Sequence, residues 1–237
     1  MEPPSTSHNE AFILRISIVI PTLNEAAQIG ELIRQTRQVG ECEIIVVDGG
    51  SGDGTRERST EADRILTSEP GRARQQNRGA ASASGDVLLF LHSDCRLPGG
   101  AFRSIRTVLD DPHTVGGCFR QSIDAEGIGY RLLEWGNAIR VRWWKMAYGD
   151  QAIFVRKTVF DELGGFPDLR LMEDVYLMKR LRRQGRFVLI DEPIRVSARR
   201  WQQRGLVRQT LRNWVLLMMA RCGVHPDRLA RFYPHIR

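Results

Sequence analysis

The sequence predicts an α/β fold in which a mostly parallel central sheet is flanked by helices on both faces. Short apolar runs of about four to six residues alternate with helical patterns through the first half, which is typical of parallel strands buried on both sides. With 237 residues and 42% hydrophobic content, the chain can form one large domain with a C-terminal extension. No apolar run approaches the roughly 18 residues of a membrane-spanning helix.

The first half is expected to form a doubly wound βαβαβαβ unit. Expected strands lie at 16–20, 43–47, 65–66 and 87–91, and expected helices at 25–38, from Thr55 onward and at 71–84. Asn24 is of a residue type that caps helix N-termini, so it is expected to begin the first helix. A glycine-rich loop at 49–54 follows the second strand.

The second half is less regular. Its expected helices lie at 99–109, 128–146, 172–184 and 204–221, and its expected strands at 115–122, 152–155 and 187–190. Gly185 follows the third of these helices, at the position where glycine commonly ends a helix.

Charge and cysteine content indicate which partners and which cellular compartment to expect. Residues 179–237 hold fifteen Lys or Arg and three acids, a net charge of +12, so residues 1–178 carry −5. A basic tail of this kind favours an anionic partner such as a phosphate compound or a membrane surface. No nucleic-acid-binding motif accompanies it, so nucleic acid is not expected. The scattered cysteines indicate free thiols in a reducing, cytoplasmic compartment: Cys42, Cys95, Cys118 and Cys222. Residues 1–14 lack a signal-peptide pattern and are expected to be disordered.

Polar residues follow three of the expected strands directly. Pro21 and Thr22 follow the first, Asp48 the second, and His92 and Asp94 the fourth. The carboxyl ends of parallel strands are where open α/β sheets bind ligands. The loop after Asp48 is neither a dinucleotide fingerprint nor a P-loop. A turn with capped helices remains the alternative for each strand end.

Several acids in these segments could carry chemistry. Asp48, Asp53 and Asp94 share one sheet edge, and Mg²⁺ or Mn²⁺ takes one or two protein carboxylates together with substrate phosphates. His92 could add a nitrogen ligand to Mn²⁺ or take no part. Glu173 and Asp174 open a helix, where acids are ordinary, but either could serve as a general base.

Taken together, the motifs resemble those of glycosyltransferase family 2, which has the GT-A fold. The match covers about 15–190, and the whole chain resembles a small bacterial single-domain subgroup. The resemblance rests on these segments: Pro21-Thr22-Leu23-Asn24-Glu25, Val46-Val47-Asp48-Gly49-Gly50-Ser51, Asp53-Gly54-Thr55, Arg74-x-x-Asn77-x-Gly79, Gly85-Asp86, Leu91-His92-Ser93-Asp94, Gly164-Gly165-Phe166 and Glu173-Asp174.

The resemblance implies an enzyme that transfers a sugar, with inversion, from a nucleotide diphosphate sugar, typically a UDP-sugar. It implies a nucleotide-sugar-binding half at 15–98, an acceptor-binding and catalytic half at 99–200, and a basic amphipathic tail at 201–237. Asp174 would be the catalytic base with Glu173 beside it, and Asp94 with His92 would hold Mg²⁺ or Mn²⁺. The implied nucleotide contacts are Pro21, Thr22, Leu23, Glu25, Asp48, Gly50, Arg72, Arg74, Asn77 and Ser93. The implied acceptor or diphosphate contacts are Asp150, Gln151, Arg199, Arg200 and Trp201.

Two departures from the family pattern keep alternatives open. His92 stands where the family's metal motif begins with an acid, and the Arg-Trp element lacks the full pattern of processive polymer synthases. A single transfer is therefore expected. A nucleotidyltransferase is a rival, although the loop after the first strand has no Lys or Arg. A non-catalytic relative that binds nucleotide or membrane is a second rival.

Aromatic and basic residues alternate in the second half. Trp135, Trp143, Trp144 and Tyr148 lie among arginines, and 204–221 places arginines beside an apolar run. Such stretches pack on a core, line an acceptor site, form a homodimer contact or lie on an anionic bilayer. The acceptor is unidentified and could be lipid-like, with the chain at the inner face of the cell membrane.

Overall fold

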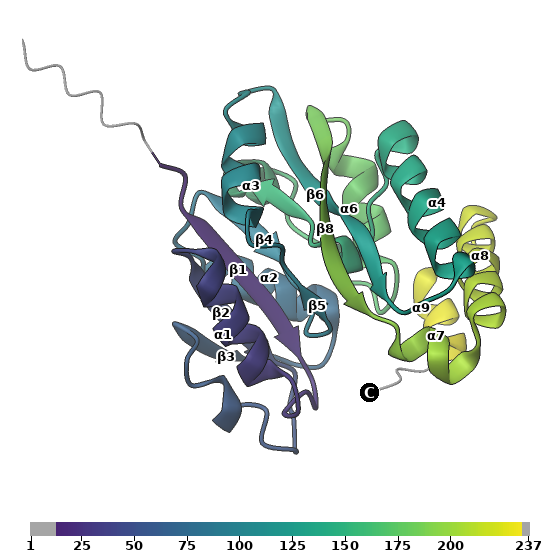
Figure 1. The fold of residues 1–237 in the computed structure, drawn as a ribbon, viewed down its shortest axis with the longest axis horizontal. Helices are drawn as coiled ribbons and strands as arrows, with labels where there is room; N and C mark the ends of the chain where they lie inside the picture. The colour runs from purple at the N-terminus through teal and green to yellow at the C-terminus, as the bar shows by residue number, and fades with distance from the viewer. Residues whose placement is uncertain (1–12, 234–237) are drawn as a thin grey trace, which may run out of the picture.

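The computed structural model describes residues 13–233 and confirms the predicted α/β fold. Almost all of the segment expected to be disordered lies outside these residues. Within the described part of the chain, one eight-stranded sheet has the order β3-β2-β1-β4-β7-β6-β8-β5. Figure 1 shows the two halves of the chain side by side, with the C-terminal helices at the end far from β1, β2 and β3.

The first half forms the parallel part of the sheet. Strands β1 (Ile16–Thr22), β2 (Glu43–Asp48), β3 (Arg64–Thr67) and β4 (Val87–Phe90) all run in one direction. The apolar runs of β1, β2 and β4 are fully buried between helices, which explains why they do not alternate with polar residues. Ile65 and Leu66 of the edge strand β3 are only partly buried. Helices α1 (Ile29–Val39) and α2 (Arg72–Ser82) connect these strands, and a 3₁₀ turn, η1 (Glu57–Ser59), precedes β3.

The predicted start of the first helix is wrong. Helix α1 begins at Ile29, and Asn24 does not cap it. Asn24 instead adopts a left-handed conformation with φ of 54°, which asparagine tolerates better than most residues. Its Oδ1 accepts from the N–H of Gly52 at 3.1 Å, and its own N–H donates to Ser51 Oγ at 2.8 Å. Asn24 therefore binds the glycine-rich loop instead of the helix.

The second half completes the sheet in mixed directions. Strand β7 (Phe154–Arg156) pairs antiparallel with β4 and with β6 (Thr114–Asp124), whereas β8 (Arg186–Ser197) pairs parallel with β6. Strands β6 and β8 are longer than predicted. The two-residue β5 (Cys95–Arg96) was not predicted, because it forms only by pairing with the end of β8.

Three helices of the second half differ by a few residues from the prediction: α3 (Ala101–Leu109), α4 (Ile128–Trp144) and α6 (Glu173–Leu181). Helix α5 (Lys157–Glu162) and the 3₁₀ turn η2 (Gly149–Gln151) before β7 were not predicted. Helix α6 ends before Gly185, which is not its cap. A Cβ at Gly185 would lie 2.6 Å from Val115 Cγ1, so packing against the neighbouring strand favours glycine there.

The helix expected at 204–221 is α8 (Leu206–Arg221), which begins two residues later than predicted. A short helix that was not predicted, α7 (Arg199–Arg204), precedes it, and Gly205, with φ of 81°, separates the two. Glycine adopts this left-handed conformation without steric cost. Helix α9 (Pro226–Leu229) and η3 (Ala230–Phe232) then fold back against α8. Between residues 13 and 233, no helix combines the length and apolarity needed to cross a bilayer.

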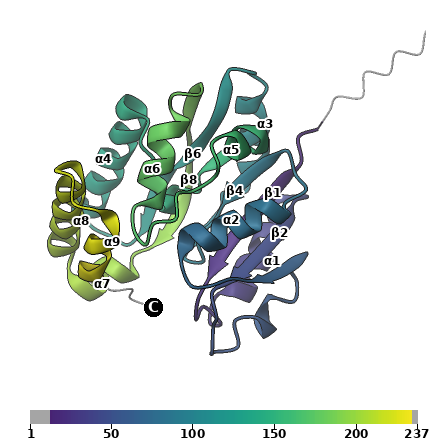
Figure 2. The same cartoon turned by 180° about the vertical axis from the view of Figure 1, so that it is seen from behind.

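Helices cover both faces of the sheet, as Figures 1 and 2 show from opposite sides. On one face Leu32 of α1 and Phe102 of α3 join the core with the alternate residues of β1 and β4. On the other face Ala80 of α2, Phe160 of α5 and Leu177 of α6 pack against the remaining strand residues. The site therefore rests on a sheet that is fixed from both sides.

Close packing of α2 on the sheet makes Gly79 a sensitive position. A Cβ there would lie 2.4 Å from Val19 Cγ1 and 3.1 Å from Val47 Cγ2. Gly79→Ala is expected to lower the free energy of unfolding by about 1–3 kcal/mol, because overpacking forces the helix away from β1 and β2. Urea denaturation at neutral pH measures this change.

Gly136 in α4 is the matched control. A Cβ at Gly136 meets no atom within 4 Å, and alanine is the better helix former. Gly136→Ala is therefore expected to raise the free energy of unfolding by roughly 0.5–1 kcal/mol. Equal effects of the two substitutions would show that helix propensity decides the result at Gly79 and that contact with β1 does not.

Candidate active site

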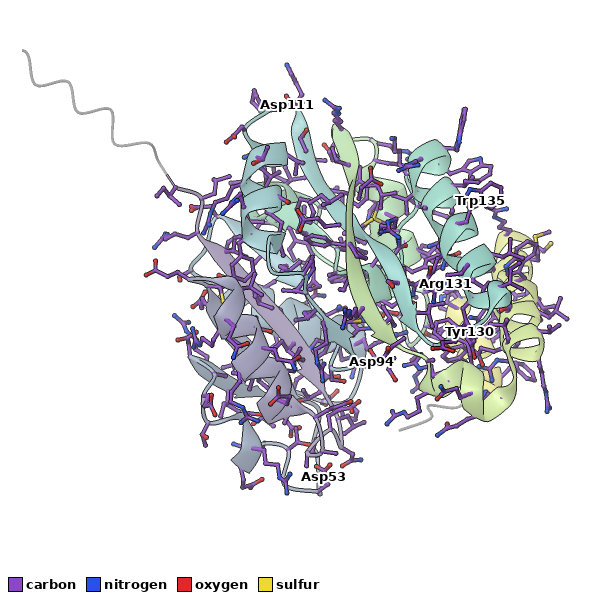
Figure 3. The ribbon with its side chains drawn as sticks, viewed as in Figure 1. Asp53, Asp94, Asp111, Tyr130, Arg131 and Trp135 are labelled. Carbon is purple, nitrogen blue, oxygen red and sulfur yellow. The ribbon has the colours of Figure 1, made fainter. Side chains whose placement is uncertain are left out.

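The fold brings the end of β4 next to the end of β8. After β4 the chain passes His92 and Asp94 and enters β5, whose Cys95 pairs with Val196. The carbonyl of Asp94 accepts a hydrogen bond from the N–H of Ser197 at 3.0 Å. This pairing places Asp94 beside α7, at the junction between the two halves that Figure 3 shows.

A pocket opens at this junction. It brings together seven of the expected site residues, from five separate segments: Arg72, His92, Asp94, Asp150, Asp174, Arg200 and Trp201. Three carboxylates and two guanidinium groups therefore face one cavity. Such a mixture of charges can bind a diphosphate through the arginines and a cation or a hydroxyl proton through the acids.

Asp174 is held rigidly at the start of α6. Its Oδ2 accepts from the N–H of Gly149 at 2.7 Å, and its Oδ1 accepts from the N–H of Val175 at 2.7 Å. Met172 just before it is left-handed, with φ of 63°, a conformation that costs a non-glycine residue about 1 kcal/mol or more. The strained turn and the two N–H donors together fix the orientation of the Asp174 carboxylate.

Glu173 points away from the pocket into a buried ion pair. Its Oε1 lies 2.9 Å from Nε of Arg72, and its side chain is only 2% exposed. Its Oε2 has no hydrogen-bond partner. Burial raises the pKa of Glu173 and Arg72 opposes that shift, while Glu173 raises the pKa of Arg72. The pair links α2 to α6 and positions Arg72 at the pocket.

Asp150 belongs to a buried polar network beneath the pocket. Its Oδ2 accepts from Gln121 Nε2 at 2.7 Å, and Gln121 in turn accepts from Asn137. Arg140 donates to Gln151 at 2.7 Å and stacks on the Tyr148 ring at 3.6 Å. Burial raises the pKa of the Asp150 carboxyl, Asp94 and Asp174 add to this shift, and Arg140 opposes it.

His92 lies against Gly149. A Cβ at Gly149 would come within 2.8 Å of His92 Nε2, so only glycine allows the ring this position. The buried Nε2 has no hydrogen-bond partner. Burial lowers the pKa of His92 to about 4, and Arg72 adds to that shift. The imidazole is therefore neutral at neutral pH and keeps a lone pair.

The donors at the pocket fit a hard divalent cation that shares its ligands with a substrate. Asp94 supplies one carboxylate, whose Oδ1 accepts a weak hydrogen bond from the Cys95 thiol at 3.6 Å. The neutral His92 supplies an unpaired nitrogen. No group of three or more acidic, histidine or cysteine side chains able to hold a metal occurs within residues 13–233. Diphosphate oxygens would therefore supply the remaining ligands.

Most of the residues expected to contact the nucleotide lie at the ends of β1 and β2. Thr22 and Asp48 pair across the two strands. Asp48 Oδ2 accepts from the N–H groups of Gly50 and Ser51 at 3.1 and 3.0 Å, and Oδ1 accepts from the Ser51 hydroxyl. Asp48 thus already orders its own loop. Pro21, Leu23 and Glu25 continue this edge, and Ser93 lies beside it with a 3.4 Å contact to Gln28.

Asp53 and Gln75 also stabilise this edge. The Asp53 carboxylate accepts from the N–H of Ala26 at 3.0 Å, so it fixes the turn before α1 and does not line the pocket described above. Gln75, which sequence reasoning missed, donates to the carbonyls of Thr22 and Val47 at 2.7 and 2.8 Å. Its position in an Ala/Arg/Gln-rich helix gave no signal of this contact.

Four other expected site residues lie outside this pocket. Arg74 pairs with Asp168 at 2.9 Å on the surface. Asn77 makes two hydrogen bonds to the backbone of Phe166, at 2.8 and 2.9 Å, and so acts as a brace between α2 and the Gly164-Gly165 turn. Gln151 is fully buried and accepts from Arg140. Arg199 is exposed at the start of α7.

One wall of the pocket is apolar and aromatic. Sequence reasoning missed most of it, because its members are far apart in the chain and carry no catalytic pattern: Tyr148, Leu171, Met172, Val175, Val196, Leu216, Leu217 and Tyr233. Arg200 donates to the Tyr233 hydroxyl at 3.2 Å, which ties the end of the described chain to α7. Helices α8 and α9 therefore form part of the site.

Comparison with known proteins identifies similar chains. The family model described as "Glycosyl transferase family 2" matches residues 17–172. "Glycosyltransferase AglE" of Haloferax volcanii is 36% identical over 92 residues, which are 34% of this chain and 30% of that protein. An "undecaprenyl-phosphate 4-deoxy-4-formamido-L-arabinose transferase" of Salmonella paratyphi B is 31% identical over 124 residues, 46% of this chain and 38% of that protein. The match thus spans well under half the length of these curated relatives.

Solved structures share the fold. "Mannosyltransferase PcManGT" from Pyrobaculum calidifontis, in complex with GDP-Man and Mn²⁺, has a TM-score of 0.66 at 18% identity, covering 93% of this chain and 68% of that one. S. aureus TarS in complex with UDP-GlcNAc has a TM-score of 0.61 at 16% identity, covering 78% of this chain and 58% of that one. At these identities the likeness concerns the fold, which is the GT-A fold.

Proposed function

The chain belongs to glycosyl transferase family 2, and from that premise we propose that it transfers a sugar from a nucleotide diphosphate sugar to an acceptor hydroxyl with inversion. The single observation that carries the proposal is the convergence of Asp94, Asp174 and Arg72 on one pocket at the carboxyl end of β4. A UDP-sugar is the proposed donor, because UDP and UDP-GlcNAc are bound in TarS complexes of the same fold.

Asp174 is the proposed general base. Its carboxylate is oriented by two backbone N–H groups and faces the cavity. It would take the proton of the acceptor hydroxyl as that oxygen attacks the anomeric carbon, from the face opposite the diphosphate. One displacement of this kind inverts the anomeric centre. Asp150 is the second candidate base, because its raised pKa would also suit proton transfer.

Arg72 and Arg200 are the proposed diphosphate contacts. Both line the pocket, and the buried Glu173 holds Arg72 in place. Asp94 and His92 are the proposed ligands of Mg²⁺ or Mn²⁺, which would supply Lewis-acid stabilisation of the charge on the leaving group. Positive groups fixed before the reaction stabilise that charge without reorganisation, which is worth roughly 3 kcal/mol for one donor.

The acceptor is proposed to carry apolar surface beside its hydroxyl. Leu216, Leu217 and Val175 form the wall next to Asp174, with Trp201 and Tyr233 nearby. The name of the Salmonella relative specifies a lipid-linked phosphate. A lipid-like acceptor is therefore the proposal that fits both the wall and that relative.

Binding of nucleotide sugars tests the proposal. UDP-glucose, UDP-GlcNAc and GDP-mannose are titrated against the full chain, with and without Mn²⁺, by calorimetry. One UDP-sugar is expected to bind more tightly with Mn²⁺. Asp94→Asn is expected to weaken that binding by roughly 10- to 100-fold or more. Loss of a mere outer-shell partner of a metal already has an effect of this size.

Asp161→Asn is the matched control. Asp161 is a half-exposed acid in a surface pair with Lys157, and its variant is expected to bind as the native chain does. Binding of GDP-mannose alone would replace the proposed donor. Binding of no nucleotide sugar, or equal metal dependence in Asp94→Asn, would contradict the proposed function.

A further inference from the structure

Helix α4 exposes apolar side chains on one side. Ile128, Leu132, Trp135 and Trp143 follow the spacing of a single helix face, and each is 60–81% exposed. Trp135 projects from α4 at the edge of the molecule in Figure 3. Isolated exposed apolar residues are common, but four on one side of a helix form a contiguous surface of the kind that marks an interaction site.

Helix α8 has the same property. Five apolar side chains on one side of α8 are 56–69% exposed: Val207, Leu211, Trp214, Val215 and Met218. The polar Gln209 is buried. Because Leu216 is buried on the same side as Gln209, α8 carries apolar residues on its exposed side as well as on its buried side, unlike the usual amphipathic surface helix. We call the nine residues on α4 and α8 the apolar face.

The two halves of the apolar face point to the same side of the molecule. The helices touch at their first turns, where a Cβ on Gly129 would lie 2.4 Å from Leu206 Cδ2, and Figure 1 shows them running in the same direction. An α-helix turns about 100° per residue around its axis. Around the axis of α4, the apolar side lies about 80° from Gly129. Around the axis of α8, the apolar side lies about 120° from Leu206, measured in the opposite direction, so both sides face the same way. Two parallel helices then present one continuous surface.

Cations border this surface. Arg208 and Arg221 flank the apolar side of α8, and Lys145 follows α4. Within the described chain none of the three forms an ion pair. Residues 199–221 hold six arginines and no acid. Arg131 and Arg142 add charge along α4, although Glu134 and Asp191 pair with them.

We propose that the apolar face and its cationic border dock the chain on the surface of an anionic lipid bilayer. Tryptophan is the side chain that most favours the boundary between lipid headgroups and acyl chains, and basic residues beside an apolar helix side are typical of helices that lie in that boundary. A second copy of the chain fits less well. A two-fold contact places the same patch against itself, so Arg208 and Arg221 would face like charges.

The opposite side of α8 lines the pocket through Asn213, Leu216 and Leu217. Docking therefore places the bilayer within one helix diameter, roughly 10–12 Å, of the pocket. This consequence rests on the proposed function, and it assigns the acceptor to the class of membrane amphiphiles. The docking itself does not depend on catalysis.

Flotation of the purified full chain with vesicles tests the docking. Vesicles of phosphatidylcholine alone are compared with vesicles that also contain phosphatidylglycerol. The chain is expected to float with the anionic vesicles and to be released by salt. Arg208→Gln with Arg221→Gln is expected to weaken partitioning about fivefold for each arginine removed. Leu211→Ala with Trp214→Ala is expected to weaken it by roughly tenfold or more, because two apolar side chains no longer enter the interface.

Matched controls lie far from the apolar face. Ile13 is an equally exposed apolar residue that precedes β1, and Arg56 and Arg103 are exposed arginines in the loop after β2 and in α3. Ile13→Ala and Arg56→Gln with Arg103→Gln are expected to float as the native chain does. Donor binding by all variants is measured separately, so a failure of the proposed function is distinguishable from a failure of docking.

Three results would overturn the proposal. The native chain stays in the dense fraction with anionic vesicles, or the face variants and the controls float equally well. In the third result, the native chain binds no vesicles, light scattering shows that it is a dimer, and Leu211→Ala with Trp214→Ala dissociates that dimer. The apolar face would then join two copies of the chain.

Discussion

Replacing Asp174 with asparagine is expected to lower kcat by about 10²- to 10⁴-fold, the usual contribution of a general base. Asparagine keeps one oxygen for the N–H of Gly149 or Val175 but cannot accept the acceptor's proton. The donor is held by other residues of the pocket, so its dissociation constant is expected to change only a few-fold. Steady-state transfer to an acceptor and calorimetric donor binding measure the two effects.

Asp150→Asn separates the two candidate bases. Asp150 accepts from Gln121, deeper in the polar network, so its variant is expected to lose less activity than Asp174→Asn. The reverse order, with Asp150→Asn inactive and Asp174→Asn active, would move the base to Asp150. Asp174→Asn also loses one hydrogen bond to the backbone, about 1 kcal/mol, and urea unfolding checks that the variant remains folded.

Arg72→Met is expected to lower the free energy of unfolding by about 3–5 kcal/mol, because it leaves the buried Glu173 carboxylate without its cation. Glu173 is 2% exposed, and its Oε2 already lacks a partner. Arg72→Met combined with Glu173→Gln removes the buried charge as well. Most of the lost stability is therefore expected to return in the double variant, as measured by urea denaturation.

The loss depends on pH in a definite direction. Without Arg72, burial raises the pKa of Glu173 further above its value of about 4.3 in an unfolded chain. Protonated Glu173 carries no charge to desolvate, so the deficit is small near pH 4 and grows as the pH rises through the folded pKa. Arg74→Met is the control on the same helix. Its pair with Asp168 is exposed, and its loss is expected to cost less than about 1 kcal/mol. Equal instability of Arg72→Met and the double variant would show that the pair is not coupled.

Much of the fold could be predicted because its strands are continuous apolar runs. Residues 44–47 and 87–91 contain no polar residue, and they form the cores of β2 and β4 nearly as expected. The order of strands and helices then leaves few topologies. The elements that were missed depend on distant partners. Strand β5 exists only through β8, and Asn24 bonds to the glycine-rich loop, where local preference favoured a helix cap.

The pocket could be predicted only in part, for the same reason. Asp94, Asp150 and Asp174 follow recognisable local patterns, and the structure brings them together. Asn77 and Arg74 belong to an equally recognisable pattern, but their side chains bind Phe166 and Asp168. The apolar wall from α8 carries no pattern that distinguishes it from core, because its role follows from the position of α8 against α6.

The four cysteines differ in burial, so one of them can be labelled selectively. Burial raises the pKa of the Cys42 thiol to about 11 and raises the pKa values of Cys95 and Cys118 further. Cys222 alone among the four is exposed, and it follows the last turn of α8. A maleimide fluorophore would therefore attach selectively at the end of the apolar face without any engineered cysteine. Its emission would report, in the native sequence, whether that end of the helix is in water or in lipid.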